Sequence, residues 1–247
     1  MSRWRAAGTH LAISAAIAAG VLALMLAYWY PPPLFGVMGG SGLALILIGV
    51  DVVMGPALTL IVFKSGKPGL KFDLAVIAAC QLAALVYGCH VISLARPAFI
   101  VFVKDQFQVV TVSELAPERL AEARYPQFRQ PSWAGPQLVF GEWPTEAADQ
   151  QRLIDAVIHL EDLQHFPKHY APYEQGRTEL LSQALPLAQV HKVEPEVAKV
   201  IDAWLASSGS QADSLRYLRL RGRRGWVAVL IDRVTAQPVK LLMTERF

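Results

Sequence analysis

The chain has 247 residues, of which 53% are hydrophobic and only 17% are charged, against about 25% charged residues in an average soluble domain. Residues 1–94 hold seven charged side chains, whereas residues 95–247 hold 18 basic and 18 acidic ones. This distribution excludes a disordered chain and an ordinary cytosolic domain. It also argues against a nucleic-acid-binding protein, because the net charge of +3 comes from the apolar part and not from a soluble surface.

Three apolar runs, at residues 11–30, 43–63 and 72–94, predict three transmembrane helices. About 20 mainly apolar residues suffice to cross about 30 Å of hydrocarbon. The first run ends in Tyr28-Trp29-Tyr30, as at an interfacial aromatic belt, and three prolines that cannot continue a helix follow it. It is long for a cleaved signal peptide and shows no clear cleavage site before the aromatic residues, so we expect it to be retained.

The basic residues of the short loops predict how the chain is oriented in the membrane. Five of them flank the spans on one side: Arg3, Arg5, Lys64, Lys67 and Lys71. Residues 31–42, between the first two spans, carry no charge. Because basic loops stay in the cytoplasm, the N-terminus is expected there and residues 95–247 on the far side, which is the periplasm of a Gram-negative bacterium. Arg96 alone argues for the reverse.

Residues 95–247 predict an α+β domain with an antiparallel sheet, because the pattern changes to that of strands after Arg96-Pro97. A hairpin is expected from residues 98–103 and 107–112. Further strands are expected at residues 137–141, 215–221, 226–232 and 239–243, the last three as a meander. Helices are expected at residues 113–124, from an N-cap at Thr145 to Leu163, at 175–185 and at 196–206. Cys80 and Cys89 lie about 13 Å apart along the third span, too far for a disulfide within one helix.

Asp51 is an unusual residue for its position, since a carboxylate inside a span is costly unless it is protonated, paired or facing a cavity. Counted at 1.5 Å per residue, Asp51 lies about 20 Å from Lys64, and Gln81 lies about 15 Å from Lys71. The two side chains can therefore meet at a similar depth. Three interpretations follow: an internal Asp51–Gln81 pair, recognition of a partner's polar group, and a proton or ion path, which one carboxylate in three spans supports least.

Gly55-Pro56 lies one turn beyond Asp51 in the second span. Proline frees a carbonyl in the preceding turn and tends to kink a helix. The pair therefore either serves simple helix packing or opens a groove that admits another transmembrane helix.

The sequence predicts no metal, no cofactor and no catalytic site. His159, His165 and His169 are close in sequence, but Pro167 interrupts any helix there and the spacing matches no zinc pattern. The nucleophile-elbow, phosphate-loop and dinucleotide motifs are absent from the sequence. We therefore expect a protein that is not an enzyme.

Five arginines gather on and around the hairpin expected at residues 215–232: Arg216, Arg219, Arg221, Arg223 and Arg224. They form either a solvated face that protects the hairpin from edge pairing or a surface for an acidic protein partner or lipid headgroups.

A series of segments runs through residues 40–115 in a specific order. They are DVVMGPALTL at residues 51–60, FK at 63–64, KPGLKFDL at 67–74, QLAAL at 81–85, YG at 87–88 and RP at 96–97, followed by Phe102 and Phe107. Their order and spacing resemble those of the type IV pilin accessory proteins. Residues 116–247 carry no motif of that family, and partner specificity is expected there.

The resemblance implies a bacterial inner-membrane protein without enzymatic activity that supports the assembly of a cognate type IV pilin into pili. Such proteins are viewed as pilin-specific chaperones or modulators of pilus dynamics. The implied partners are that pilin and inner-membrane components of pilus assembly, with membrane lipid around the spans. A membrane groove and a periplasmic domain together would hold both the hydrophobic helix and the head of a pilin.

A second interpretation is a membrane-anchored periplasmic sensor or ligand-binding module that takes a small ligand or a cell-wall fragment. A sensor needs a cytoplasmic output module, however, and only about ten N-terminal residues and one short loop are expected to face inward. An intramembrane enzyme would need two polar catalytic groups at one depth, and Asp51 with Gln81 is not a familiar pair of that kind.

Overall fold

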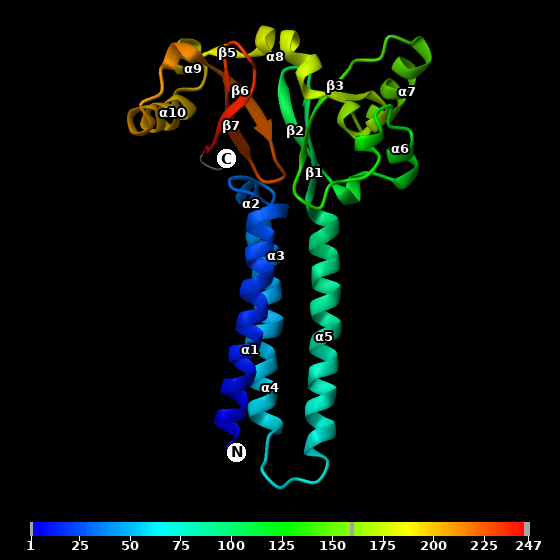
Figure 1. Ribbon diagram of the computed structural model, residues 1–247, viewed down its shortest axis with the longest axis vertical. Helices are drawn as coiled ribbons and strands as arrows, with labels where there is room; N and C mark the ends of the chain where they lie inside the picture. The colour runs from blue at the N-terminus through cyan, green and yellow to red at the C-terminus, as the bar shows by residue number, and fades with distance from the viewer. Residues whose placement is uncertain (1, 159–160, 245–247) are drawn as a thin grey trace.

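The computed structural model, which describes residues 2–158 and 161–244, has the shape of a broad head on a stalk of three long helices (Figure 1). The N-terminus and the loop between the second and third helices lie at the end of the stalk far from the head. All three helices are long and apolar enough to cross a membrane, which confirms the three predicted spans. The chain is therefore a membrane protein.

Each span lies close to its predicted limits, except that the first begins at Arg3, eight residues earlier than expected. The first consists of α1 (Arg3–Leu24) and the π-helical turn η1 (Met25–Trp29). The second consists of α3 (Gly40–Ile48), the π-helical turn η2 (Gly49–Met54) and α4 (Gly55–Val62). The third is α5 (Leu70–Ala95), and the short helix α2 (Leu34–Val37) connects the first two spans. Large apolar side chains such as Leu45, Ile61 and Leu82 point outward, as expected in contact with lipid.

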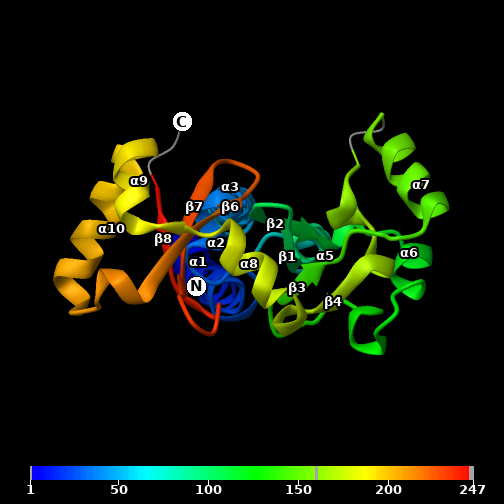
Figure 2. The same ribbon diagram turned by 90° about the horizontal axis from the view of Figure 1, so that it is seen from above.

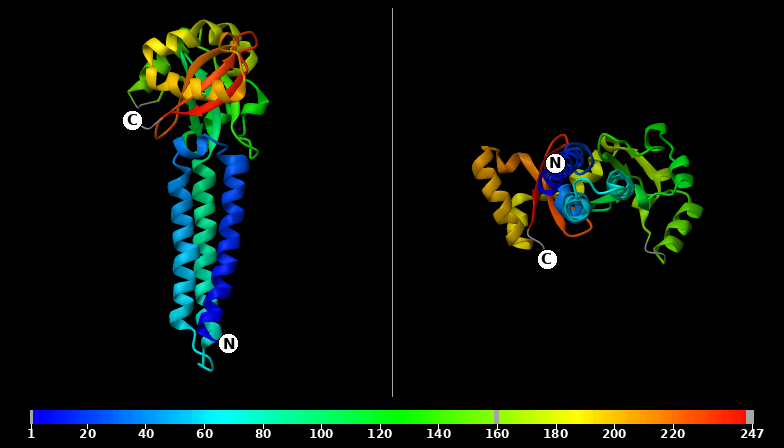
Figure 3. Two further views of the ribbon diagram at one scale, coloured as in Figure 1. Left: turned by 90° about the vertical axis from the view of Figure 1, so that its left-hand side faces the viewer. Right: turned by 90° about the horizontal axis from the view of Figure 1, so that it is seen from below.

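The second span lies between the other two. Both α1 and α5 pack against α4 and η2. Figure 3 shows the three helices side by side along the length of the stalk and, from below, as three separate rods. The stalk is therefore an open arrangement in which α1 and α5 flank a shared central helix.

The head is built on one mixed sheet of eight strands in the order β4-β3-β1-β2-β6-β7-β8, with β5 paired to β6. The strands are β1 (Pro97–Val103), β2 (Gln106–Thr111), β3 (Gln137–Gly141), β4 (Tyr170–Pro172), β5 (Leu185–Pro186), β6 (Leu215–Arg221), β7 (Trp226–Asp232) and β8 (Pro238–Met243). The predicted hairpin and the predicted meander are both present. The sheet differs from the expected antiparallel one at two places, where β1 pairs with β3 and β2 with β6 in parallel.

Helices cover the two ends of the sheet and form two lobes (Figure 2). One lobe carries α6 (Pro117–Ala121) and α7 (Ala147–Val157) beside β3 and β4. The other carries α9 (Leu187–Val193) and α10 (Pro195–Ser208) beside β6–β8, and α8 (Arg177–Gln183) crosses the middle. The α+β architecture is therefore confirmed.

Two predicted helices of the first lobe are shorter than expected. A 3-10 turn at Val112–Glu114, closed by a capping box from Thr111 to Glu114, and the separate helix α6 replace the helix predicted at 113–124. Thr145 is not the N-cap of α7, because that helix begins two residues later behind Glu146. The helix ends at Val157, and residues 159–160 of its predicted continuation toward Leu163 lie outside the described residues.

The second lobe contains elements that the pattern did not indicate. The helix predicted at 175–185 divides into a 3-10 turn (Tyr173–Gly176), α8 and the short strand β5. Helix α10 matches the predicted helix at 196–206, whereas α9 was not predicted, and neither was β4 in the first lobe. Each missed element has at most seven residues, too few to establish a hydrophobic period.

One hydrophobic core joins the head to the top of the stalk. It contains Met25, Trp29, Tyr30, Leu34 and Val37 from the end of the first span and α2. It also contains Phe102, Phe107, Leu220 and Val227 from the sheet. The head is therefore packed onto the stalk through buried side chains and not merely tethered to it.

Candidate functional site

The polar residues predicted inside the membrane come together halfway along the stalk. Asp51 lies in η2, Gly55-Pro56 begins α4, and Gln81 faces them from α5. Gln81 Nε2 donates a hydrogen bond to the backbone carbonyl of Asp51 at 3.3 Å. The contact therefore differs from a pairing of the two side chains, because the acceptor is the main chain and not the carboxylate.

Pro56 explains why the Asp51 carbonyl is available. In a π-helical turn, the carbonyl of residue 51 would bond to the N–H of residue 56, and proline has no N–H. The Gln81 amide takes the place of that missing donor. Gly55 provides the space for it, since a Cβ at this position would lie 1.8 Å from Gln81 Nε2.

The arrangement leaves two buried oxygen atoms without partners. Only 6% of Asp51 is exposed, and its Oδ1 has no hydrogen-bond partner among the described residues. Gln81 Oε1 is likewise buried and unpaired among them. Gln81 Oε1 is a hydrogen-bond acceptor. Asp51 Oδ1 is an acceptor in an ionised carboxylate, and a protonated carboxyl group also keeps acceptor capacity. Unpaired polar groups inside a membrane are expensive, so this pair marks the site as specialised.

Two cavities open beside these residues, and Asp51 lines both of them. A cavity of about 160 Å³ lies between α1 and α5 and is lined by Asp51, Gln81, His10, Ser14 and Leu82. A cavity of about 410 Å³ lies between the second span and α5, where Leu47, Tyr87 and Gly88 form part of its wall. Both are mainly apolar, so the mid-stalk site combines an apolar surface with a few polar groups.

A second polar contact joins the first two spans nearer the N-terminal end of the stalk. His10 Nδ1 and Thr59 Oγ1 are 2.6 Å apart and hydrogen-bonded. Thr59 is buried. Neither residue was a predicted site residue, although each is a polar side chain within or at the edge of an apolar run, which is the signal that identified Asp51.

The junction of stalk and head is closed by Arg96, the first residue after α5. Its guanidinium lies 4.1 Å from the centre of the Trp133 ring and 6.0 Å from that of Trp29. Arg96 Nη1 also donates a hydrogen bond to the carbonyl of Ser93. Nearby, the Tyr30 hydroxyl donates to the carbonyl of Ile92. Arg96 thus serves as a buried structural cation, which explains its position against the basic-loop pattern.

The five arginines predicted as one surface make different contacts. Arg219 forms an ion pair with Glu194 at 2.9 Å, and Arg216 donates to its neighbouring carbonyl of Leu215. The guanidinium groups of Arg219 and Arg221 both lie within 6 Å of the centre of the Trp226 ring. Arg219 is therefore engaged within the head, and the role of the five arginines as a contact surface stays a prediction.

Arg223 and Arg224 lie in the turn between β6 and β7, at the stalk junction. The backbone N–H of Arg224 donates to the carbonyl of Val37 at 2.8 Å. A Cβ on Gly39 would lie 2.9 Å from Arg224 Nε, so the arginine side chain passes closely over that glycine. This turn docks onto the connection between the first two spans, and the Arg223 and Arg224 side chains remain exposed.

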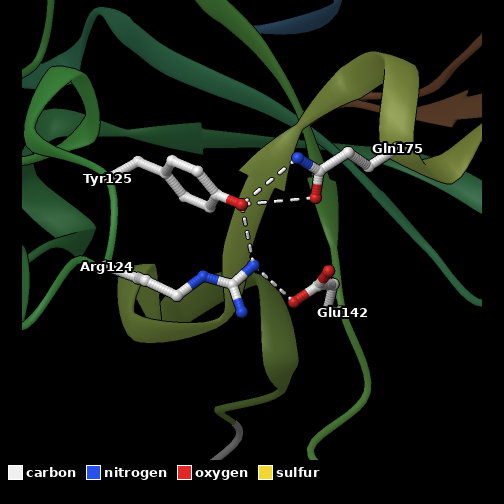
Figure 4. Close-up of polar contacts among 4 residues, drawn as sticks. All are labelled: Arg124, Tyr125, Glu142 and Gln175. Atoms are coloured by element: carbon white, nitrogen blue, oxygen red, sulfur yellow. Dashed lines mark hydrogen bonds and ion pairs between the residues drawn. The ribbon is translucent and has the colours of Figure 1, made fainter.

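The first lobe of the head contains a cleft of about 730 Å³. Arg124 lines it and donates to both Glu142, at 2.7 Å, and the hydroxyl of Tyr125, which in turn contacts Gln175 (Figure 4). At another part of the wall, the hydrogen bond from Lys168 holds the pKa of the Asp149 carboxyl below its usual range. Most of its charged groups are therefore paired, and the cleft is polar and wide.

The described part of the chain contains no cluster of three or more potential metal ligands. His165 Nδ1 accepts a hydrogen bond from the backbone N–H of Asp162, and burial lowers the pKa of His169. His159 lies outside the described residues. The structure thus brings the membrane residues together, whereas the histidines form no site within residues 2–158 and 161–244.

Comparison with known proteins assigns this three-span membrane architecture to a family. A family model described as "Fimbrial assembly protein FimB" matches residues 1–39. The fimbrial assembly proteins of serogroups I and E1 of Dichelobacter nodosus are 31% and 30% identical over 185 residues, which is 74% of this chain and 71% of each relative. The protein of serogroups C1 and C2 is 34% identical over 119 residues, or 47% of this chain and 90% of the relative.

The chain therefore belongs to the family of fimbrial assembly proteins. This confirms the resemblance to pilus accessory proteins that residues 40–115 indicated. No solved structure matches the chain significantly.

Proposed function

We propose that this protein is a non-enzymatic inner-membrane accessory protein that supports the assembly of a cognate type IV pilin into pili, as a chaperone or modulator of that pilin. The relatives in Dichelobacter nodosus are named as fimbrial assembly proteins. The observation that carries the mechanism is the open stalk, whose cavities beside Asp51 lie between α5 and the two other spans.

The open stalk suits the handling of a single transmembrane helix. A helix that lies in an apolar groove keeps its own apolar surface from associating with other copies. The head stands directly above the groove because it shares a hydrophobic core with the top of the stalk. One protein is thereby able to contact both the membrane helix and the soluble part of a pilin before assembly.

The distribution of basic residues supports the proposed orientation. The N-terminus and the loop between α4 and α5 lie together at the end of the stalk far from the head (Figure 3). The N-terminal segment carries Arg3 and Arg5, and the loop with its flanking residues carries Lys64, Lys67 and Lys71. With the positive-inside rule, this end faces the cytoplasm and the head faces the periplasm.

Photo-crosslinking in the native host tests the proposal. A photoreactive phenylalanine analogue replaces Leu82, which lines the smaller cavity, or Trp143, which lines the cleft of the head. The matched control is Ile61, which is 78% exposed on the outside of the stalk and lines neither cavity. A pilin-sized adduct from Leu82 but not from Ile61 is expected, and absence of any pilin adduct from Leu82 and Trp143 would overturn the proposal.

The head cleft favours a second candidate function, that of a membrane-anchored periplasmic ligand-binding module. Its volume of about 730 Å³ is within the range of small-molecule sites, and Trp143 at its wall is half-exposed. A small ligand or cell-wall fragment would raise the Tm of the purified protein, and Trp143→Ala would abolish that rise. Normal pilus assembly in a strain with the Trp143→Ala protein would separate this function from the first one.

A further inference from the structure

We propose that the groove between α1 and α5 is a binding site for a partner's transmembrane helix that carries a hydrogen-bond donor at mid-membrane depth, which Asp51 Oδ1 and Gln81 Oε1 accept. This inference rests on the proposed function, because it assigns the chemistry by which the stalk recognises its occupant. It also defines the polar feature that such an occupant needs.

The depth of the two acceptors comes directly from their positions in the spans. Asp51 is the central residue of the second span, Gly40–Val62, with 11 residues on either side. Gln81 lies close to the middle of the third span, Leu70–Ala95. Water is absent at this depth in a bilayer, so an unpaired acceptor has to obtain its donor from protein.

The internal contacts of the site leave two acceptor oxygens unpaired among the described residues. One N–H of the Gln81 amide donates to the carbonyl of Asp51. That contact is held in place by Gly55 and Pro56, as described above. The side chains of Gln81 and Asp51 both line the cavity between α1 and α5. An occupant with an amide, hydroxyl or amine group complements this surface, and a purely apolar helix does not.

The cavity is bounded by helices on two sides. Its walls are α1, through Ser14 and Ile17, and α5, through Ala78 and Leu82. Leu82 is 61% exposed, so this wall faces the lipid. Asp51 also lines the cavity, and because its Oδ1 and Gln81 Oε1 are themselves buried, a seated donor reaches them once these side chains rotate.

The variant Asp51→Leu tests the acceptor role. Leucine removes the unpaired oxygen and remains compatible with an apolar interior, so the protein is expected to accumulate at least at the wild-type level. The Leu82 photo-crosslink to the partner is expected to fall about 3- to 10-fold, the range for losing an interhelical hydrogen bond in a membrane. Thr9→Val, which removes a hydroxyl bonded to the Arg5 carbonyl and lies in neither cavity lining, is the control and leaves the adduct unchanged.

Two further variants keep the test decisive. If Asp51→Leu fails to accumulate, Gln81→Met removes the second acceptor while it keeps the side-chain length, and the adduct is again expected to fall. Ala78→Leu fills the groove from an exposed position and is expected to abolish the adduct with both acceptors intact. Asp51→Asn retains an acceptor: an unchanged adduct identifies a neutral donor, and a reduced one identifies a cationic donor.

The outcomes separate this inference from the proposed function. A wild-type adduct that neither Asp51→Leu nor Gln81→Met reduces would overturn the donor recognition and leave the pilin-helper function standing. An adduct from Trp143 with none from Leu82 would overturn the groove as the binding site and would also leave the pilin-helper function standing. A Leu82 adduct of twice the protein's own mass would show that a second copy occupies the groove and would overturn the inference. No pilin adduct from either position would overturn both.

Discussion

The junction of head and stalk and the middle of the stalk show opposite ways of arranging polar groups in an apolar setting. At the junction, Arg96 is enclosed by Trp133 and Trp29, and Tyr30 donates its hydroxyl proton to a main-chain carbonyl. Halfway along the stalk, Asp51 and Gln81 keep unpaired oxygens beside two cavities. The first region is filled by its own side chains, although Arg96 Nε has no hydrogen-bond partner among the described residues, whereas the second leaves its acceptors beside open cavities.

The difference separates a tightly packed region, the junction, from a region with open cavities, the middle of the stalk. Packing and hydrogen bonds at the junction fix the head relative to the spans. The open middle loses stability through its unpaired acceptors, and in the proposed mechanism these acceptors select the occupant of the groove. Variants that loosen the packing at the junction, or that change the contacts in the middle of the stalk, therefore test this comparison.

The largest effect is expected for Arg96→Ala at the junction. The variant loses the stacking of a desolvated guanidinium on Trp133 and the hydrogen bond to Ser93, and we expect the free energy of unfolding to fall by about 2–4 kcal/mol. Thermal unfolding of the purified protein in detergent, followed by tryptophan fluorescence, measures it. Arg96→Lys keeps the charge but not the planar group, so its free energy of unfolding should lie between those of the wild type and of the alanine variant. An alanine variant as stable as the wild type would show that the junction does not depend on this cation.

Gly55→Ala addresses the middle of the stalk. A Cβ there meets the Gln81 amide at 1.8 Å and forces it off the Asp51 carbonyl, so the free energy of unfolding is expected to fall by about 1–3 kcal/mol. Gly49→Ala, in the adjoining π-helical turn η2 and with no neighbouring atom within 4 Å, is the control and should show no loss. The double variant Gly55→Ala/Gln81→Ala should recover part of the stability, and failure to do so would place the strain elsewhere.

Gly39→Ala and Gly66→Ala form a matched pair with nearly the same backbone angles. Their φ values are +78° and +77°, so each alanine is expected to cost about 1–2 kcal/mol in a left-handed conformation. Only Gly39 lies against Arg224, whose flexible side chain has to move, which adds less than about 1 kcal/mol. Equal losses for both variants, measured by thermal unfolding, would show that the close approach of Arg224 contributes nothing.

The smallest effect is expected for His10→Leu. It removes the hydrogen bond between α1 and α4, and such bonds in membranes average about 0.6 kcal/mol. A double-mutant cycle with Thr59→Val isolates the pair, since the two losses should not add. Additive losses would mean that the two side chains act independently.

The sequence predicts the stalk more completely than the head. Each span is an uninterrupted apolar run, and hydropathy alone locates it to within a few residues. A count of 1.5 Å per residue brings Asp51 and Gln81 to one depth. The use of the carbonyl and not of the carboxylate could not be predicted, because it depends on a π-helical turn that Gly49–Met54 adopt in the folded stalk.

In the head, contacts between distant segments are what the sequence does not reveal. Strands β3 and β6 join β1 and β2 in parallel only after long connections, and no local pattern encodes that pairing. In the connection between the first two spans, Gly39 and Gly42 lie beside Arg224, whereas Gly36 faces Met243 and Gly40 faces Phe35. The contact with the turn around Arg224 becomes visible only when the chain is folded.

The closed junction has a consequence for which partners are accepted. Gln81 lies 14 residues before the end of α5 at Ala95, so the acceptors are about 21 Å below the base of the head. Because the head is packed onto the stalk through a shared hydrophobic core, the distance between the two contact regions is set by the fold. A partner that engages both regions has to place its donor about 14 helical residues from its soluble part, and a change of one turn in that spacing, about 5.4 Å, would set one of the two contacts out of reach.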